Sequence, residues 1–298
     1  MRRQQWAAFH TTRSEFGLSR AMRFSLWLLR TLCTVALMQG TQTAVKGAEL
    51  RLDAAYAVTL AGLPIGEISG RLEIDERRFK LTAEGATSGA FRLFLNGHGE
   101  MATSGIRSHG EALPSKYTLT TTIRSQIETV RLTFSNRNVT EVSIDPEPAS
   151  NGGLLPITEA HRIRVVDPLA AALVSMPDPA TQPGPETCQR TVPVFDGRVR
   201  YDLKLGFKRF VDVTTPNGYK GTAIVCAMYF TPIAGHDPNR FLFKYLSEQR
   251  DMEVWLVLLT GTGVMVPYRV AIRTPLGMGS MEAKRLELDG TSAATNSP

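Results

Sequence analysis

The chain has 298 residues, of which 43% are hydrophobic and 21% are charged, and its formal net charge is +6. Residues 1–48 hold seven basic side chains and one acidic side chain, which leaves 27 of each sign in the rest of the chain (34 − 7 and 28 − 1). This neutral remainder argues against nucleic-acid binding, because a phosphate-binding surface needs a basic excess on one face.

The N-terminal segment has the pattern of a secretory leader. Met22–Met38 is a short apolar run with Arg13, Arg20 and Arg23 before or at its start and small residues after it. Because the run is short for a membrane span, we expect a cleaved leader within residues 1–48, with Met22 as an alternative start. The mature protein is then expected to start between about Ala44 and Glu49. An uncleaved inner-membrane anchor over residues 22–38 is the alternative.

The rest of the chain repeats one pattern, in which hydrophobic and polar residues alternate. Such runs are typical of half-buried strands, and Gly, Pro, Asn and Asp residues separate them. About a dozen runs predict a mainly β fold, an antiparallel barrel or spiral-like rolled sheet. The predicted strands are Leu50–Leu60, Ile65–Ile74, Phe79–Ala83, Tyr117–Ile123, Ile127–Phe134, Val139–Ile144, a hairpin over Val192–Leu205, Val211–Val213, a run around Cys226, Val254–Leu259, Val264–Ile272 and Glu282–Leu288.

Helix signals are sparse. Asp167-Pro168 before LAAALVSM predicts a short helix with proline at its first position, and Asn239–Arg250 and Ala90–Leu95 are two further candidates. Two proline-rich stretches divide the chain. We therefore expect an N-terminal β half over 49–145, a proline-rich connection with a short helix over 146–186, a C-terminal β half over 187–290 that closes one continuous β domain, and a disordered tail over 291–298.

Two cysteines fall in predicted β structure. Asp196-Gly197 between two alternating arms predicts a tight hairpin, and Cys188 lies at its outer end. Cys226 lies in the alternating run TAIVCAMYF. Since an exported chain meets an oxidising compartment, we expect a disulfide between Cys188 and Cys226. Two buried free thiols are the alternative.

Several motifs occur in an order that resembles a known family. They are YAVTLAGLPIGEISGRLEID, then Asp167-Pro168 before the predicted helix, then Cys188 with FDGRVRYDLKL, and finally GTAIVCAMYFTPIAG. Over roughly Leu50 to Leu288 the chain resembles the bacterial family called domain of unknown function 3108. The resemblance implies a β-rich protein of the Gram-negative envelope, located in the periplasm, and it brings no catalytic residue with it.

Known catalytic and cofactor motifs are absent from the sequence. It contains no nucleophile elbow, phosphate-binding loop, dinucleotide fingerprint, zinc-protease motif or Cys-x-x-Cys. His98 between two glycines is more typical of a turn than of a base, and a hydrolase is supported only by the scattered carboxylates of Glu84, Glu100 and Asp202. We therefore expect no enzyme activity, no metal and no cofactor.

An aromatic-rich stretch gives the main functional hypothesis. Its members could line an apolar cavity, because a barrel of this size can enclose a lumen, or they could simply pack the core. The first hypothesis is a binding or carrier module for an amphipathic or lipid-like envelope component. The alternative is a non-catalytic envelope-integrity protein that acts through protein or cell-wall contacts. The candidate cavity-lining residues are Met228, Phe230, Phe241, Phe243, Tyr245 and Trp255.

Overall fold

The structure is a computed structural model that describes residues 50–89, 92, 96–108, 111–148, 153–176 and 182–290. The predicted leader over 1–48 and the predicted tail over 291–298 lie outside the described residues, as does most of the predicted turn at Ala90–Leu95. The described residues belong to one compact unit. Among its helices, none is long and apolar enough to cross a membrane.

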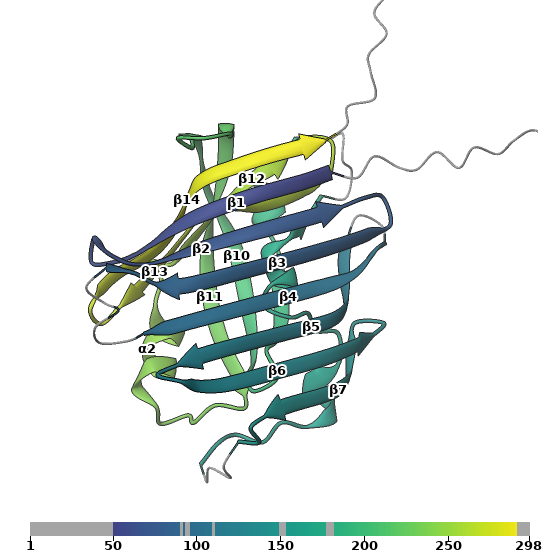
Figure 1. Ribbon diagram of the computed structural model, residues 1–298, viewed down its shortest axis with the longest axis vertical. Coiled ribbons are helices and arrows are strands. Elements are labelled where there is room, and N and C mark those ends of the chain that lie inside the picture. The colour runs from purple at the N-terminus through teal and green to yellow at the C-terminus, as the bar shows by residue number, and fades with distance from the viewer. Residues whose placement is uncertain are drawn as a thin grey trace, which may run out of the picture. The chain divides into compact units, whose positions relative to one another are not determined.

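One antiparallel sheet organises the described chain, and it contains 14 strands. β1–β7 lie side by side in sequence order, and β1 pairs with β14, from which β13, β12, β11, β10 and β9 follow (Figure 1). The open, curled sheet confirms the predicted fold class. The strands are β1 Leu50–Leu60, β2 Leu63–Ile74, β3 Arg78–Thr87, β4 Gly97–Ser108, β5 Glu111–Ile123, β6 Gln126–Ser135, β7 Asn138–Asp145, β8 Val174–Ser175, β9 Thr191–Phe195, β10 Arg200–Thr214, β11 Lys220–Ala234, β12 Glu253–Leu259, β13 Val264–Thr274 and β14 Gly277–Gly290.

Tight turns join the N-terminal strands. Leu60 pairs directly with Leu63, so β1 and β2 are joined by two residues, Ala61 and Gly62, both with positive φ. Positive φ at both central positions defines the primed turn that matches the twist of a hairpin. The same geometry joins β5 to β6 through Arg124 and Ser125.

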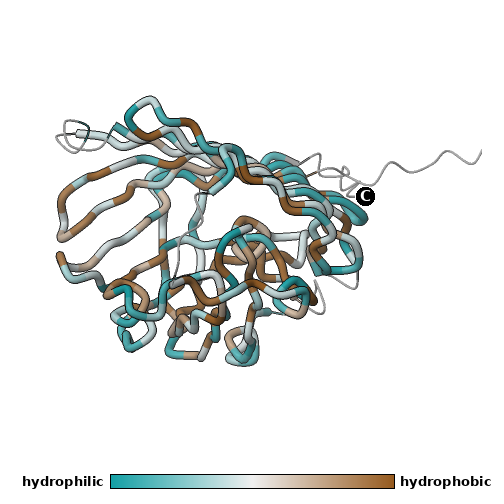
Figure 2. The backbone as a smooth tube through the Cα atoms, turned by 90° about the horizontal axis from the view of Figure 1, so that it is seen from below, coloured by the Kyte–Doolittle hydropathy of each residue, from teal (hydrophilic) through white to brown (hydrophobic). Residues whose placement is uncertain are grey.

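The sheet curls back on itself. β10 and β11 pass behind the first strands and cross them steeply (Figure 1), and hydrophobic residues lie along the space between the two walls (Figure 2). The two ends of the strand order, β7 and β9, are bridged by residues 165–176, which we call the inner segment. Val165 donates to the carbonyl of Arg137 in the β6–β7 turn, and Val166 donates to Pro193 of β9.

The inner segment is buried and contains a charged residue. Asp167 is fully buried, and its carboxylate accepts hydrogen bonds from Thr103 of β4 (2.8 Å) and from the backbone N–H groups of Leu169 (3.0 Å) and Ala170 (2.8 Å). These bonds satisfy a group that would be costly to bury alone. They also fix the start of the inner segment against β4.

Two local predictions differ from the structure. The helix expected after Asp167-Pro168 is only the 3₁₀ turn η3 (Ala170–Ala172), because Val174 and Ser175 then extend to pair with Met265 and Val264 of β13. Tertiary pairing thus overrides helix propensity at this position. Strand β4 was not predicted, since its sequence, GHGEMATSGIRS, lacks hydrophobic alternation.

Other expected elements are present. The Asp196-Gly197 hairpin forms, with the Asp196 carboxylate accepting from the N–H groups of Arg198 and Val199. Helix α2 spans Phe241–Glu248 within the predicted 239–250 range. The two remaining 3₁₀ turns among the described residues are η2 (Glu159–Arg162) and η4 (Pro185–Cys188).

The disulfide joins η4 to β11. Cys188 and Cys226 are both fully buried, their Cα atoms are 5.5 Å apart, and the bridge closes a separation of 38 residues. The expected pairing is therefore present in the structure. It ties the segment that leads into β9 to the centre of the C-terminal strands.

Candidate functional site

An apolar cavity of about 400 Å³ lies between one face of β10–β14, the inner segment and α2. This volume falls within the range of roughly 300–1,000 Å³ that is typical of small-molecule sites. Its lining is almost entirely aliphatic or aromatic: Pro168, Ala171, Ala172, Val174, Val192, Tyr201, Leu203, Leu205, Met228, Phe230, Leu246, Met252, Val254, Leu256, Pro267, Val270, Ile272 and Met281.

Strand register explains why these side chains gather. Successive residues of a strand point to opposite faces, and residues directly paired across strands share a face. Leu203 pairs with Phe230, and Leu205 pairs with Met228. The same apolar face continues from β11 through β12 and β13 to β14, where Val270 pairs with Met281.

Helix α2 covers one side of the cavity. Leu246 belongs to the lining, and the ring of Phe243 stacks on that of Phe230 with centroids 6.3 Å apart. Phe243 also contacts His236, 4.9 Å between ring centroids, and His236 is buried. None of the eight residues of α2 is fully buried, so few contacts hold this helix in place.

Among the lining residues, Tyr201 of β10 carries the one polar side-chain group. Tyr201 is part of the lining, and its ring contacts Phe230 at 5.3 Å. Burial raises the pKa of Tyr201, which therefore stays a neutral hydroxyl. Burial also raises the pKa of Asp167 to about 6, although hydrogen bonds from Ala170, Thr103 and Leu169 oppose the shift.

The structure separates the six residues predicted to line a cavity. Met228 and Phe230 are in the lining, and Phe243 packs behind Phe230. Phe241 is 65% exposed and contacts Tyr245 on the outside of α2, so neither lines the cavity. An eight-residue helix can direct only one face toward the sheet, and Phe241 and Tyr245 lie on its other side.

Trp255 also lies outside the lining of the apolar cavity. Val254 and Leu256 line the cavity, so Trp255 between them points to the opposite face of β12. There it stacks with Tyr268 (6.3 Å) and lies near the guanidinium groups of Arg209 and Arg269, at 5.5 and 5.3 Å. Trp255 was predicted to line the cavity because it follows other aromatic residues in the sequence. Strand alternation instead places it on the face of β12 opposite to Val254 and Leu256.

Glu253 organises the charges beside Trp255. Its carboxylate accepts from Lys208 (2.6 Å), from both terminal nitrogens of Arg209 (3.1 and 3.2 Å) and from the Trp255 indole (3.0 Å). Burial opposes ionisation, but these hydrogen bonds together outweigh it and lower the pKa of Glu253 to about 2. One carboxylate is thus shared by two cations, Lys208 and Arg209, and the cluster keeps a net positive charge.

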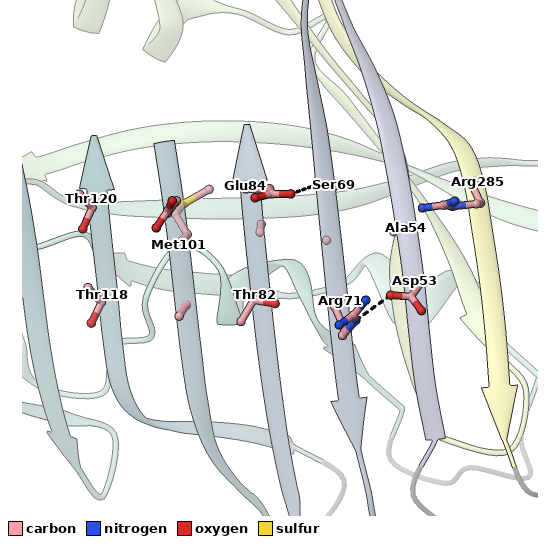
Figure 3. Close-up of a pocket in the computed structure, with 14 residues that line it drawn as sticks. Asp53, Ala54, Ser69, Arg71, Thr82, Glu84, Met101, Thr118, Thr120 and Arg285 are labelled. Carbon is pink, nitrogen blue, oxygen red and sulfur yellow. Dashed lines mark hydrogen bonds and ion pairs between the residues drawn. The ribbon is translucent and has the colours of Figure 1, made fainter. Parts of the chain in front are cut away.

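A polar groove of about 580 Å³ crosses β14 and β1–β5 on the exposed side (Figure 3). Arg71 is paired with Asp53 at 2.8 Å, and Ser69 donates to Glu84 at 2.9 Å. The Arg71 hydrogen bond lowers the pKa of Asp53. Asp53, Arg71 and Glu84 thus have partners within the groove, which has the character of a solvated outer surface.

The carboxylates considered for hydrolysis do not form one site. Glu84 and Glu100 are opposite each other on β3 and β4, with His98 3.1 Å from Glu100, and all three side chains are solvent-accessible. Asp202 is instead paired with Arg200 on β10, at 2.7 Å. Within the described residues, no group of three or more His, Cys, Asp or Glu side chains is arranged to hold a metal ion.

Together, fold and cavity define a mainly β protein built on one open, curled antiparallel sheet with an apolar cavity. The chain belongs to the family described as "Protein of unknown function (DUF3108)", whose model matches residues 55–284. This match confirms the resemblance inferred from the sequence motifs.

Two further comparisons were made. No curated protein matches the chain. Among solved structures, the chain is similar to the crystal structure of a beta-barrel-like protein of domain of unknown function DUF1849 from Brucella abortus. That similarity has 8% identity and a TM-score of 0.43, and it covers 82% of this chain and 99% of the other.

Proposed function

We propose that this protein binds an amphipathic or lipid-like envelope component in the periplasm and acts as a carrier or sensor, by binding and not by catalysis. The apolar cavity of about 400 Å³ is the observation that carries this proposal. Many of its lining side chains, such as Leu203, Met228 and Ile272, are only partly buried. Apolar surface that the fold leaves uncovered gains free energy when a ligand covers it.

Two features support this location and mode of access. A buried disulfide is typical of proteins that fold in an oxidising compartment. Helix α2 contributes Leu246 to the lining but has no fully buried residue, so it can be displaced without exposing a packed core. We therefore place the route for the ligand beside α2.

The experiment compares two Ala→Phe variants. Ala172 lines the cavity, whereas Ala86 is exposed on the outer face of β3. A neutral, environment-sensitive apolar dye should bind the wild type and Ala86→Phe, and Ala172→Phe should reduce its affinity at least about tenfold because the new ring fills the cavity. Thermal unfolding of both variants checks that each is folded.

Two results would contradict the proposal. One is the absence of dye binding to the folded wild type, and the other is equal binding by Ala172→Phe and the wild type. Either result would favour the alternative function, an envelope-integrity protein that acts through protein or cell-wall contacts.

A further inference from the structure

A second cavity, of about 410 Å³, adjoins the apolar one. The two share Ala171, Val174 and Val192 in their linings, so they meet across the inner segment and β9. The lining of the second cavity is different in kind, because it includes Glu111, Arg137, Ser175, Gln189 and Arg190. An apolar cavity beside a polar one matches the two parts of an amphiphile.

Three buried polar atoms in this second cavity lack a hydrogen-bond partner within the described part of the chain. They are Nε of Arg190, Nε of Arg137 and Oγ of Ser175. Buried polar atoms of folded proteins are nearly always satisfied, and an acceptor bound beside these three residues would satisfy them. All three can donate a hydrogen bond, and the partner they fit is therefore an acceptor.

Arg190 is the residue best placed to bind that acceptor. Its two terminal nitrogens make only long hydrogen bonds to the Ser175 carbonyl, at 3.5 and 3.4 Å. Its backbone is held firmly, since its N–H donates to Cys188 and its carbonyl accepts from Leu205 of β10. The disulfide at Cys188 thus anchors the backbone from which the Arg190 side chain extends.

The charges facing Arg190 leave a net positive site. The carboxylate of Glu111 is paired with Arg137 at 2.8 Å. Within the described residues, Arg190 has no carboxylate at salt-bridge distance, and burial lowers its pKa. A guanidinium keeps its charge at neutral pH and binds a carboxylate or phosphate with two parallel hydrogen bonds.

We propose that Arg190, assisted by Ser175 and Arg137, binds the anionic head of an amphiphile, a carboxylate or a phosphate, while the apolar chain lies in the neighbouring cavity. This inference rests on the proposed function and specifies its ligand class. The apolar chain of the ligand would pass the small side chain of Ala171, which belongs to the linings of both cavities.

The test measures binding of three single-chain probes of equal length below their micelle-forming concentrations. Dodecanoate, dodecyl phosphate and dodecanol differ only in the head, and acetate and inorganic phosphate serve as heads without a chain. The wild type should bind at least one anionic probe about tenfold or more tightly than dodecanol, because charge-assisted hydrogen bonds are the stronger kind. Which anionic probe is preferred distinguishes a carboxylate head from a phosphate head.

Arg190→Gln should remove this preference and leave dodecanol binding unchanged, and Arg190→Lys should retain part of it. The control is Arg273→Gln, which changes an exposed arginine of β13 and should bind like the wild type. Retained dodecanol binding shows that the Arg190 variants are folded.

Three results would overturn the inference, and they differ in what they say about the proposed function. Equal binding of anionic and neutral probes, or an anion preference that survives in Arg190→Gln, refutes the head site while the apolar cavity stands. Tight binding of acetate or inorganic phosphate alone indicates a free-anion site. Failure of every chain-bearing probe refutes the proposed function together with this inference.

Discussion

The N-terminal strands β1–β7 and the C-terminal strands β10–β13 are built on opposite principles. In β6, buried residues alternate with exposed or half-buried ones from Val130 to Ser135, so one face meets the core and the other meets water. In β11 and β13, by contrast, Ala223–Ala227 and Val264–Tyr268 are each five consecutive buried residues. The first region is an outer wall, and the second has both faces covered.

This difference explains where the cavity can form. The face of β10–β13 that carries Trp255 and Val257 packs on the rest of the sheet, where Val257 joins a cluster with Leu52 and Leu72 of the wall. The other face is covered only by the inner segment and α2, which are short and irregular. A covering of this kind fills an apolar surface incompletely, and the cavity is the space that it leaves.

Removal of the disulfide, which lies wholly in the C-terminal region, should cause the largest loss of stability in this comparison. Chain-entropy arguments give about 4 kcal/mol for a loop of this size. Cys188→Ala and Cys226→Ala should each lower the free energy of unfolding by a similar amount, and the double variant should match either single one because all remove the same cross-link. Chemical denaturation measures this, and additive losses would contradict it.

Truncation of one hydrophobic side chain in each region compares the two regions directly. Leu259, on the β12 strand, is 2% exposed and packs away from the cavity, so Leu259→Ala should cost about 3 kcal/mol. Ile127, on the β6 strand of the wall, is 62% exposed, and Ile127→Ala should change stability by no more than about 0.5 kcal/mol. Similar losses at the two positions would show that the wall is not a one-sided layer.

The pH dependence of stability tests the buried carboxylate of the inner segment. The pKa of Asp167 is about 6 in the folded state against an ordinary 3.8, so the folded protein binds more protons between these values. Stability should therefore fall by about 2 kcal/mol as the pH rises from about 4 to 6, and remain lower above pH 6. Asp167→Asn should lack this component, and denaturation of both proteins across that range measures the difference.

The control for Asp167→Asn is a carboxylate of the outer wall. Asp53→Asn removes a carboxylate of the outer wall whose pKa is lowered and not raised, and it should leave the pH 4–6 component intact. A variant Asp167→Asn with the same pH profile as the wild type would mean that another group titrates in this window.

The smallest expected effect lies at a turn of the wall. Ser125 has a φ of 70° in the two-residue turn between β5 and β6, a conformation that glycine adopts more readily. Ser125→Gly should therefore stabilise the protein by up to about 1 kcal/mol. Ser143→Gly, in an exposed position of β7, should instead destabilise it slightly, because glycine weakens a strand interior. A melting temperature that falls in Ser125→Gly would contradict this account.

Much of the wall could be predicted from the sequence, because alternation is a local signal. The disulfide could also be predicted, since the expected export of the chain left few alternatives for its two remaining cysteines. The cavity could not be predicted residue by residue. Leu203, Val270 and Met281 come together only through the curl of the sheet and the order in which its strands pair.

Two local failures have physical causes as well. The inner segment carries a helix-like sequence, yet pairing of Val174 with β13 stops the helix after one turn. The sequence did not indicate a role for Arg190, because a single arginine near a cysteine matches no binding motif. Its significance arises from burial and from the unsatisfied atoms around it, which only the folded chain brings together.

The most direct test of the central claim is a crystal structure of the protein with a terminally brominated dodecanoate. We predict that the anomalous signal of bromine lies in the apolar cavity among residues such as Met228, Leu256 and Ile272, with the carboxylate at Arg190. Bromine signal only on the outer surface, or a cavity filled by side chains with no bound ligand, would contradict the account.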